Sequence, residues 1–199
     1  RRDYRSRIRL LLGINIFWLA LSALSDGLNS LVLPARLLQL QGEASATILG
    51  LVTFAGLLLA MLVQPVAGQA SDRLRARWGR RGVLLLGSAL AGFGLLLFAQ
   101  SSSLLFVLAS YLLVQGAASI AQAAQQCFIP DLVPAESRGA ASGWKSFMDL
   151  GGALLGFVVL GQLLSDGDTR PALLALVAIV FTMLLLTLLL VREPAVATT

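Results

Sequence analysis

Three charged residues stand inside long apolar segments of this sequence. Asp26 lies in the first segment, and Lys145 and Asp149 lie four residues apart in a later one. A carboxylate in hydrocarbon is costly unless it is protonated, paired or exposed to water in a cavity. Asp26 has no cation three or four residues away on its own helix, which favours a functional group. Pairing with Arg36, or capping of a kink near Gly27, would also explain it.

Lys145 and Asp149 allow two interpretations. At this spacing they can pair on one helix face, with the lysine reaching towards the aqueous surface. By helical rise, however, Asp149 lies about 14 Å into its segment, too deep for a loop residue. An ionisable group at such depth is a functional candidate. The sequence therefore supports a structural pair and a functional carboxylate equally.

Polar residues form two stripes at helical spacing. At about 100° per residue, each set falls on one face of its helix. Single polar residues usually hold helices together, whereas two full-length stripes indicate a wet cavity. The stripes are Asn15, Trp18, Ser22, Asp26 and Asn29 in one segment and Tyr111, Gln115, Ser119, Gln122 and Gln126 in another.

We predict a substrate- or cation-binding site built from these stripes and the lysine–aspartate pair. Asp26 would be the group that binds a proton or cation, with Ser22 and Asn29 one turn away as oxygen ligands or hydrogen-bond partners. The predicted binding residues are Asp26, Asn29, Ser22, Tyr111, Gln115, Ser119, Gln122, Lys145 and Asp149.

The elements that position these residues follow from composition. The chain has 199 residues, of which 57% are hydrophobic and 13% charged, more apolar surface than a soluble domain could bury. A membrane span needs about 20 apolar residues, and lipid admits only helices or closed barrels. We expect an all-α membrane protein with six spans, at about residues 8–40, 47–67, 82–99, 104–129, 140–164 and 172–191.

Several kinds of chemistry are excluded by residue content. The chain has no His and a single Cys, Cys127, which excludes a disulfide, a Cys/His metal site and His-based catalysis within it. We find neither a nucleophile with a base nor a metal cluster, so we expect no enzyme and no cofactor. The net charge of +5 comes from arginines at span ends, which favours a topology signal over nucleic-acid binding.

Basic residues predict the orientation in the membrane. Thirteen of the fifteen Lys and Arg residues fall on one side of the expected spans, and only Arg36 and Arg170 fall on the other. Because basic residues gather in cytoplasmic loops, both termini should be cytoplasmic, in a plasma (inner) membrane. If the six spans form a 3+3 inverted repeat, the two striped spans, the first and the fourth, would be its equivalent members.

The stretch from Gly68 to Arg81 holds five arginines between two apolar segments. We predict a short cytoplasmic loop here. Asp72 could accept backbone N–H bonds or pair with an Arg across a helix gap, as a latch that holds one access state. The alternative is a solvated loop whose arginines only set topology. We favour the latch for Asp72 and Arg73 and the solvated loop for Arg75 and Arg77.

This stretch resembles the signature between helices 2 and 3 of major facilitator superfamily transporters, which is Gly, three residues, Asp-Arg, a spacer and Gly-Arg-Arg. Its five-residue spacer resembles that of the glycoside–pentoside–hexuronide cation symporters and proton-linked sucrose transporters. Residues 130–139 resemble the family's loop between helices 4 and 5. The matching residues are Gly68, Asp72, Arg73, Gly79, Arg80 and Arg81, then Asp131, Glu136 and Arg138.

The resemblance implies that residues 1–199 are the amino-terminal half of a twelve-helix secondary transporter, whose carboxy-terminal half is missing. The protein would move a small solute, in this branch a sugar, by symport with a proton or sodium. Leu112 stands where drug antiporters have an Arg, and residues 149–152 lack the antiporter Pro, which argues against drug antiport. The alternative is a non-transporting membrane assembly or pigment-delivery factor of the same fold.

The resemblance and the distribution of polar residues together predict how the helices are arranged. Spans 1 and 4 should face a central cavity, spans 2 and 5 the missing half, and spans 3 and 6 should be peripheral. We expect the lipid bilayer and a small solute as partners, and no nucleic acid.

Overall fold

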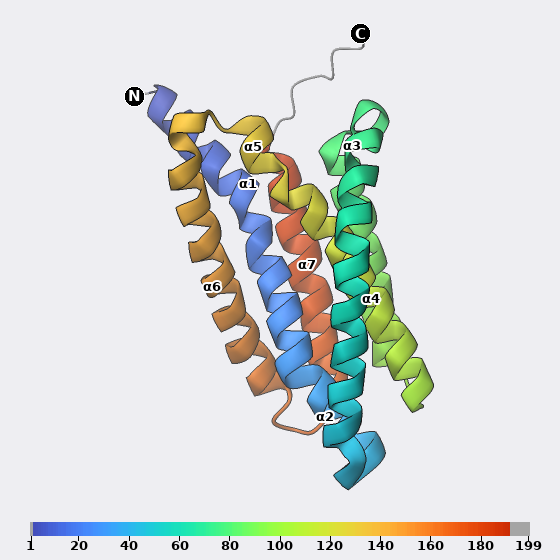
Figure 1. Cartoon of the computed structure of the whole chain (residues 1–199). Coiled ribbons are helices and arrows are strands. Elements are labelled where there is room, and N and C mark those ends of the chain that lie inside the picture. The colour runs from blue at the N-terminus through green and yellow to red at the C-terminus, as the bar shows by residue number, and fades with distance from the viewer. Residues whose placement is uncertain (1, 192–199) are drawn as a thin grey trace.

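The computed structural model describes residues 2–191, with side chains described except at residues 2–9, 43 and 74–78. Within this range, six helical segments are long and apolar enough to cross a membrane, which confirms the predicted fold class (Figure 1). The elements are α1 (Arg2–Gly27), η1 (Leu28–Val32), α2 (Leu33–Gln41), η2 (Gly42–Ala44), α3 (Ser45–Ala99), α4 (Leu104–Gln126), α5 (Phe128–Leu132), η3 (Ala135–Ser137), α6 (Arg138–Leu163) and α7 (Arg170–Leu190).

The first span contains a π-helical segment, η1, between α1 and α2. Here the backbone N–H of Leu33 bonds to the carbonyl oxygen of Leu28, five residues back. Pro34, the second residue of α2, has no N–H, and its ring would clash with the carbonyl of Ser30 in a regular α-helix. A wider turn relieves that clash, which explains why the helix carries an extra residue here.

The prediction of a loop over residues 68–81 is wrong. The helix of the second span continues through this stretch, and its backbone leaves helical geometry only at Gly79, with φ 65° and ψ 175°. Glycine adopts a positive φ without steric cost. Because arginine, alanine and leucine are good helix formers, the helix continues beyond the end of the apolar segment. At Gly79 the chain turns back into the third span (Figure 1).

The predicted loop over residues 130–139 is also shorter than expected. Pro130 and Asp131 belong to the short helix α5, because Pro is tolerated in the first turn of a helix. After a 3₁₀ turn, α6 begins at Arg138. Asp131 is therefore held on a helix that packs near the end of the second span rather than on a free loop.

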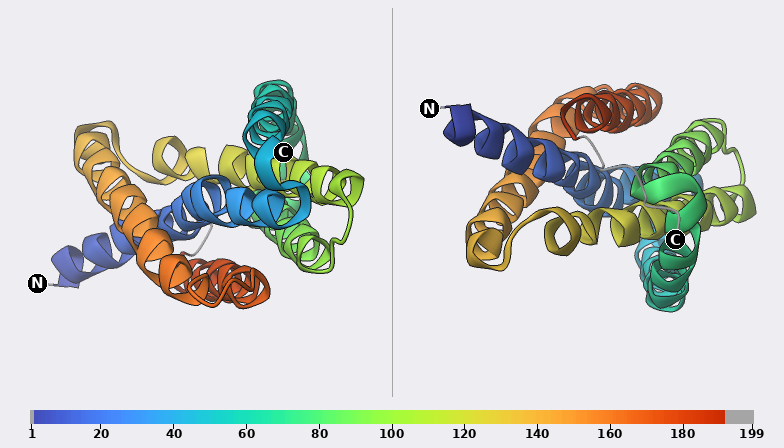
Figure 2. Two further views of the ribbon diagram at one scale, coloured as in Figure 1. Left: turned by 90° about the horizontal axis from the view of Figure 1, so that it is seen from below. Right: turned by 90° about the horizontal axis from the view of Figure 1, so that it is seen from above.

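α1 lies at the centre of the bundle, in contact with α6, α7 and α4, while α3 packs along α4 (Figure 2). Glycines allow the close approach of α1 and α6: a Cβ at Gly152 would lie 2.2 Å from the carbonyl oxygen of Leu19. The third span, expected at the periphery, is half buried because it packs on both α4 and α7.

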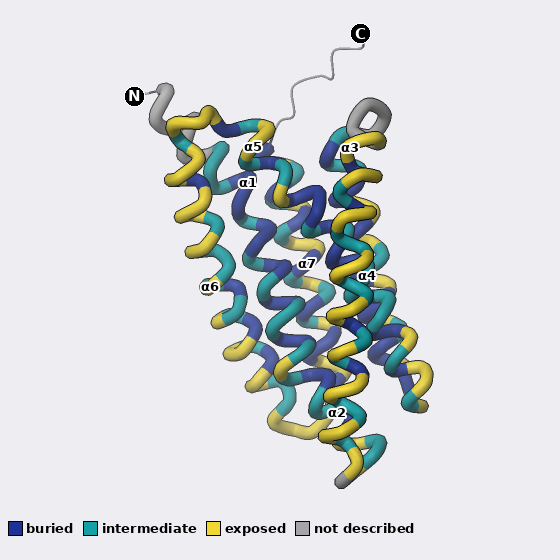
Figure 3. Tube along the Cα trace, in the orientation of Figure 1, coloured by how far each residue is buried: buried dark blue, intermediate teal, exposed yellow. Residues whose placement is uncertain are grey.

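The second and fifth spans are the most exposed (Figure 3). Only 11% and 17% of their most apolar windows are buried, against 56% in the first span. Large apolar side chains such as Phe54, Met61, Phe147 and Leu154 project from them. These two helices carry the faces that lipid or other protein helices must cover.

At the end of the bundle opposite the Gly79 turn, α2 is tied to two connections. The guanidinium of Arg36 donates to the side chain of Gln39 at 3.1 Å and to the backbone carbonyl of Ser101. The amide of Gln39 donates to the carbonyl of Gly167. The end of the first span is thereby bonded to the turn before α4 and to the turn before α7.

Candidate functional site

A polar cavity of about 360 Å³ lies between α1, α4 and α6. It collects residues from three spans that are far apart in the sequence. Both carboxylates and the lysine singled out above line it, so the predicted gathering of these three charges is present. Its lining is Trp18, Leu21, Ser22, Ser25, Asp26, Gln122, Lys145, Asp149, Leu150 and Ala153.

Lys145 and Asp149 form an ion pair within the cavity. The Nζ of Lys145 lies 3.5 Å from the Oδ2 of Asp149, and both side chains are about one third exposed. The ammonium also lies 3.9 Å from the centre of the Trp18 ring, a cation–π contact. Ser22 donates to the Oδ1 of Asp149 at 2.6 Å. The lysine thus contacts both Trp18 and Asp149.

Asp26 lines the same cavity, and among the described side chains no hydrogen bond or ion pair to its carboxylate is found. Arg36, the alternative partner, bonds to Gln39 and Ser101 instead. The two polar neighbours predicted to serve Asp26 also bond elsewhere, because Ser22 donates to Asp149 and Asn29 accepts from Tyr111. Asp26 is therefore the least satisfied charge of the cavity.

The stripe on α4 serves more than one purpose. Gln122 lines the cavity, whereas the buried Tyr111 donates to the Oδ1 of Asn29 at 2.8 Å. Gly56 makes room for that ring, since a Cβ there would lie 2.5 Å from it. Ser119 is buried and donates to the backbone of Gln115, which is half-buried. Only part of this predicted stripe reaches the cavity.

Two buried amides act between helices rather than in the cavity. Asn15, first in the α1 stripe, donates to the carbonyl of Leu11 and, at 3.3 Å, to that of Ala141 on α6. Gln125 donates to the carbonyl of Ile14 at 2.5 Å. The stripe rule missed Gln125 because it lies off the stripe, and it missed Ser25, which lines the cavity beside Asp26.

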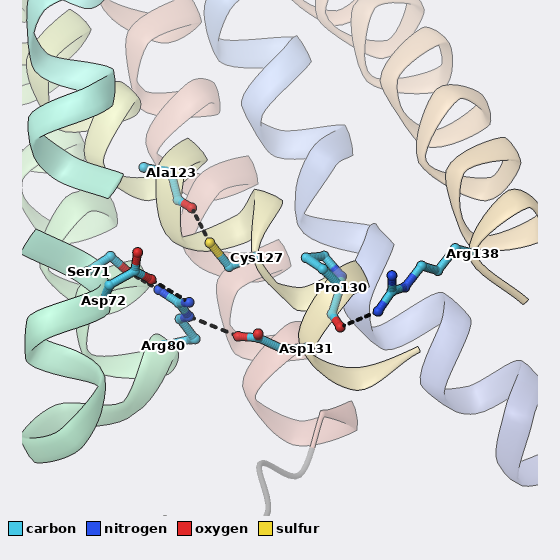
Figure 4. A network of polar contacts seen from close by, with 8 residues as sticks. All are labelled: Ser71, Asp72, Arg80, Ala123, Cys127, Pro130, Asp131 and Arg138. Atoms are coloured by element: carbon cyan, nitrogen blue, oxygen red, sulfur yellow. Dashed lines mark hydrogen bonds and ion pairs between the residues drawn. The ribbon is translucent and has the colours of Figure 1, made fainter. Parts of the chain in front are cut away.

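A second charged cluster, which we call the Arg80 network, lies near the Gly79 turn (Figure 4). The buried guanidinium of Arg80 contacts Asp72 at 2.7 Å and Asp131 at 3.0 Å, and it donates to the hydroxyl of Ser71 at 2.9 Å. One cation thereby joins the end of the second span to α5. Because the fork of Arg can bind two carboxylates at once, each contact leaves the other intact.

The sequence profile of the Major Facilitator Superfamily matches residues 11–199. The chain belongs to this superfamily. A comparison with curated proteins finds no match. Membership makes the chain part of a family of transporters rather than enzymes, and six membrane-length helices make it a multi-pass membrane protein.

The residues that match the superfamily signature differ in their contacts and in their burial. Asp72 pairs with an arginine, Arg80, which also contacts Asp131, whereas the predicted latch also includes Arg73. Arg73 is exposed, and its guanidinium makes no hydrogen bond or ion pair with the described residues. Arg81 is half-buried beside Arg80. A Cβ at Gly68 would meet open space, so nothing in the described chain explains this glycine.

The second superfamily motif supports the first. Arg138 donates to the carbonyl oxygens of Val133, at 3.2 Å, and Pro130, at 3.0 Å. It thereby fixes the end of α5, the helix that carries Asp131 (Figure 4). Glu136 lies in the exposed 3₁₀ turn, and its carboxylate makes no hydrogen bond or ion pair with other described residues. The Arg80 network is thus built from both motifs.

Proposed function

We propose that this chain is part of a secondary transporter that moves a small polar solute by symport with a proton or sodium ion. Membership of the superfamily supports transport in general. The observation that carries the coupling is the cavity itself, where Asp26 lacks a partner among the described side chains while Asp149 has two. An unpaired carboxylate among membrane spans is best stabilised by a proton or a cation.

Neutral polar groups in the cavity support an uncharged, hydrogen-bonding solute. Ser22, Ser25 and Gln122 offer hydroxyl and amide groups beside the charges, and Trp18 offers an aromatic surface. Such a mixture suits a polyhydroxylated solute, and a sugar also agrees with the branch that the spacer of residues 74–78 resembles. An assembly factor without transport has no need of an unpaired carboxylate in a polar cavity.

The open side of the cavity supports a second body of helices. Leu150, which lines the cavity, is 74% exposed, and the face of α6 around it is apolar. We infer that a carboxy-terminal six-helix half packs against α3 and α6 and closes the cavity from this side. The arginine-rich end, with both termini, would lie in the cytoplasm of a cell with this protein in its plasma (inner) membrane.

The Arg80 network would then serve as a latch between access states. It joins the second span to α5 through one buried cation, and Asp72 is 67% exposed at its edge. An exposed carboxylate exchanges partners at little cost. Rocking of the two halves could therefore break the Asp72 contact while Asp131 keeps Arg80 in place.

Asp26→Asn tests the proposal in the full-length protein. In proteoliposomes with a panel of mono- and disaccharides, the wild type should accumulate a sugar against its gradient when a proton or sodium gradient is imposed. Asp26→Asn should lose accumulation and keep downhill exchange, because the coupling charge is gone while the solute groups remain. Asp166→Asn, in the exposed turn before α7, is the matched control. Accumulation by Asp26→Asn would show that the coupling group lies elsewhere, with Asp149 next to be tested.

A further inference from the structure

The charges that line the cavity do not cancel. α1 contributes the carboxylate of Asp26, and α6 contributes Asp149 and Lys145, while Gln122 from α4 is neutral. Two carboxylates therefore face one ammonium. With both acids ionised, the described lining carries one net negative charge.

Lys145 is committed to one of the two carboxylates. Its ammonium lies 3.5 Å from the carboxylate of Asp149 and 3.9 Å from the centre of the Trp18 ring. Ser22 adds a hydrogen bond to the same carboxylate. Asp149 is thus satisfied by side chains of the protein, whereas no described side chain does the same for Asp26.

We propose that Lys145 is a tethered cation that occupies Asp149 and so fixes the number of coupling cations at this site. One position, at Asp26, remains for a proton or sodium ion. This inference rests on the proposed cation-coupled function, and it assigns to Lys145 the choice between one and two cations. Lys145 acts through Asp149 and is a positioning residue for charge rather than a group that touches the solute.

Removal of the lysine charge should open a second position. Lys145→Gln leaves two uncompensated carboxylates in one cavity, and like charges at close range raise the affinity for any cation that separates them. The variant should therefore bind one more monovalent cation than the wild type. Lys145→Arg keeps the tethered charge and should bind the wild-type number.

The test counts cations on purified full-length protein without any solute. Equilibrium binding of radioactive sodium at fixed pH forms one arm, and proton uptake measured with a pH indicator forms the other, so that sodium and proton are distinguished. We expect Lys145→Gln to gain one cation in the sum of the two arms. An unchanged count in Lys145→Gln would overturn the proposal.

A paired variant guards against misfolding of the single one. Lys145→Gln combined with Asp149→Asn removes both partners and leaves no uncompensated charge, which folded proteins tolerate better than half a pair. It should bind the wild-type number of cations. A loss of one cation in this double variant would show that Asp149 is the binding group and would also overturn the proposal.

Asp26→Asn separates this inference from the proposed function. If Asp26→Asn binds as many cations as the wild type, the proposed coupling at Asp26 fails. If Asp26→Asn loses one cation while Lys145→Gln gains none, the coupling stands and only the role of Lys145 fails.

Discussion

In the Arg80 network two carboxylates contact Arg80, and in the cavity at Asp26 two carboxylates lie with Lys145. In the network, the fork of Arg80 contacts both Asp72 and Asp131. In the cavity, the single ammonium of Lys145 contacts Asp149, and Asp26 has no such contact among the described groups. A planar guanidinium can serve two acids at once, whereas an ammonium acts as a point charge. The choice of cation therefore separates a cluster that holds helices together from one with room for a ligand.

Loss of the cation should have the largest effect in the network. Arg80→Gln removes the ion pair between Arg80 and Asp131, a carboxylate that is only 20% exposed, and breaking such a pair costs about 3 kcal/mol or more. We expect a lower melting temperature in detergent and little transport, measured by fluorimetry and flux. Lys145→Gln, the matched loss of a cation in the cavity, should lower the melting temperature less, because both partners of its ion pair are about one third exposed. Equal losses in both variants would remove the distinction between the two clusters.

The second largest effect is expected from a change in the spacing between α1 and α6, two of the helices that line the cavity. An alanine Cβ at Gly152 would lie 2.2 Å from the carbonyl oxygen of Leu19, so Gly152→Ala should force α1 and α6 apart at a cost of about 1–3 kcal/mol. Coupled accumulation should fall with it, since Asp26 and Asp149 lie on those two helices. At Gly151 a Cβ would meet open space within the described chain, and Gly151→Ala is the control. A stable, fully coupled Gly152→Ala would contradict the close contact.

Within the network, the two carboxylates should differ. Asp72 is 67% exposed and Asp131 20%, so the charge of Asp72 is better screened and its pairing should contribute about 1 kcal/mol or less. Asp72→Asn should lower transport at a normal protein level, whereas Asp131→Asn should also lower the amount of folded protein. Size-exclusion profiles and flux from the same membranes measure both. Unchanged flux in Asp72→Asn would refute the latch.

The smallest effect is expected from a neutral contact outside both clusters. Tyr111→Phe removes the hydrogen bond to Asn29 and keeps the ring that packs on Gly56. A single hydrogen bond of this kind contributes about 0.5–1.5 kcal/mol. The melting temperature should fall slightly, with cation binding unchanged. A changed cation count would place Tyr111 in the binding site, contrary to the geometry.

The sequence predicts the spans well because the length of an apolar run follows directly from membrane thickness. It predicts the stretch around residues 68–81 poorly for a related reason. The charge of a segment predicts whether that segment lies in water or in lipid, but it does not predict whether the segment is helix or loop. Here the arginine-rich segment remains helical up to Gly79. The helix is broken only at Gly79. The sequence does not reveal which glycine of the segment adopts a positive φ.

The site residues show the same division. Depth and charge alone single out Asp26, Lys145 and Asp149, and all three line one cavity. The partners are another matter, because they depend on how helices face one another. Ser22 lies one turn from Asp26 on the same helix, yet it donates to Asp149 on α6. The motif likewise offers several arginines, and only the turn at Gly79 decides that Arg80 meets Asp72.

The π-helical segment of the first span contains one more residue than a turn of regular α-helix would hold. If Leu28–Val32 tightened into an α-helix, the part beyond it would rotate by about 100° and shift by about 1.5 Å against the part below. Arg36 and Gln39 would then swing away from the carbonyls of Ser101 and Gly167 that now hold them. Those two hydrogen bonds oppose rotation of α2. Because such tightening would also press the Pro34 ring against the carbonyl of Ser30, the π segment and these two bonds together fix the orientation of α2 relative to the part of the span that carries Asp26.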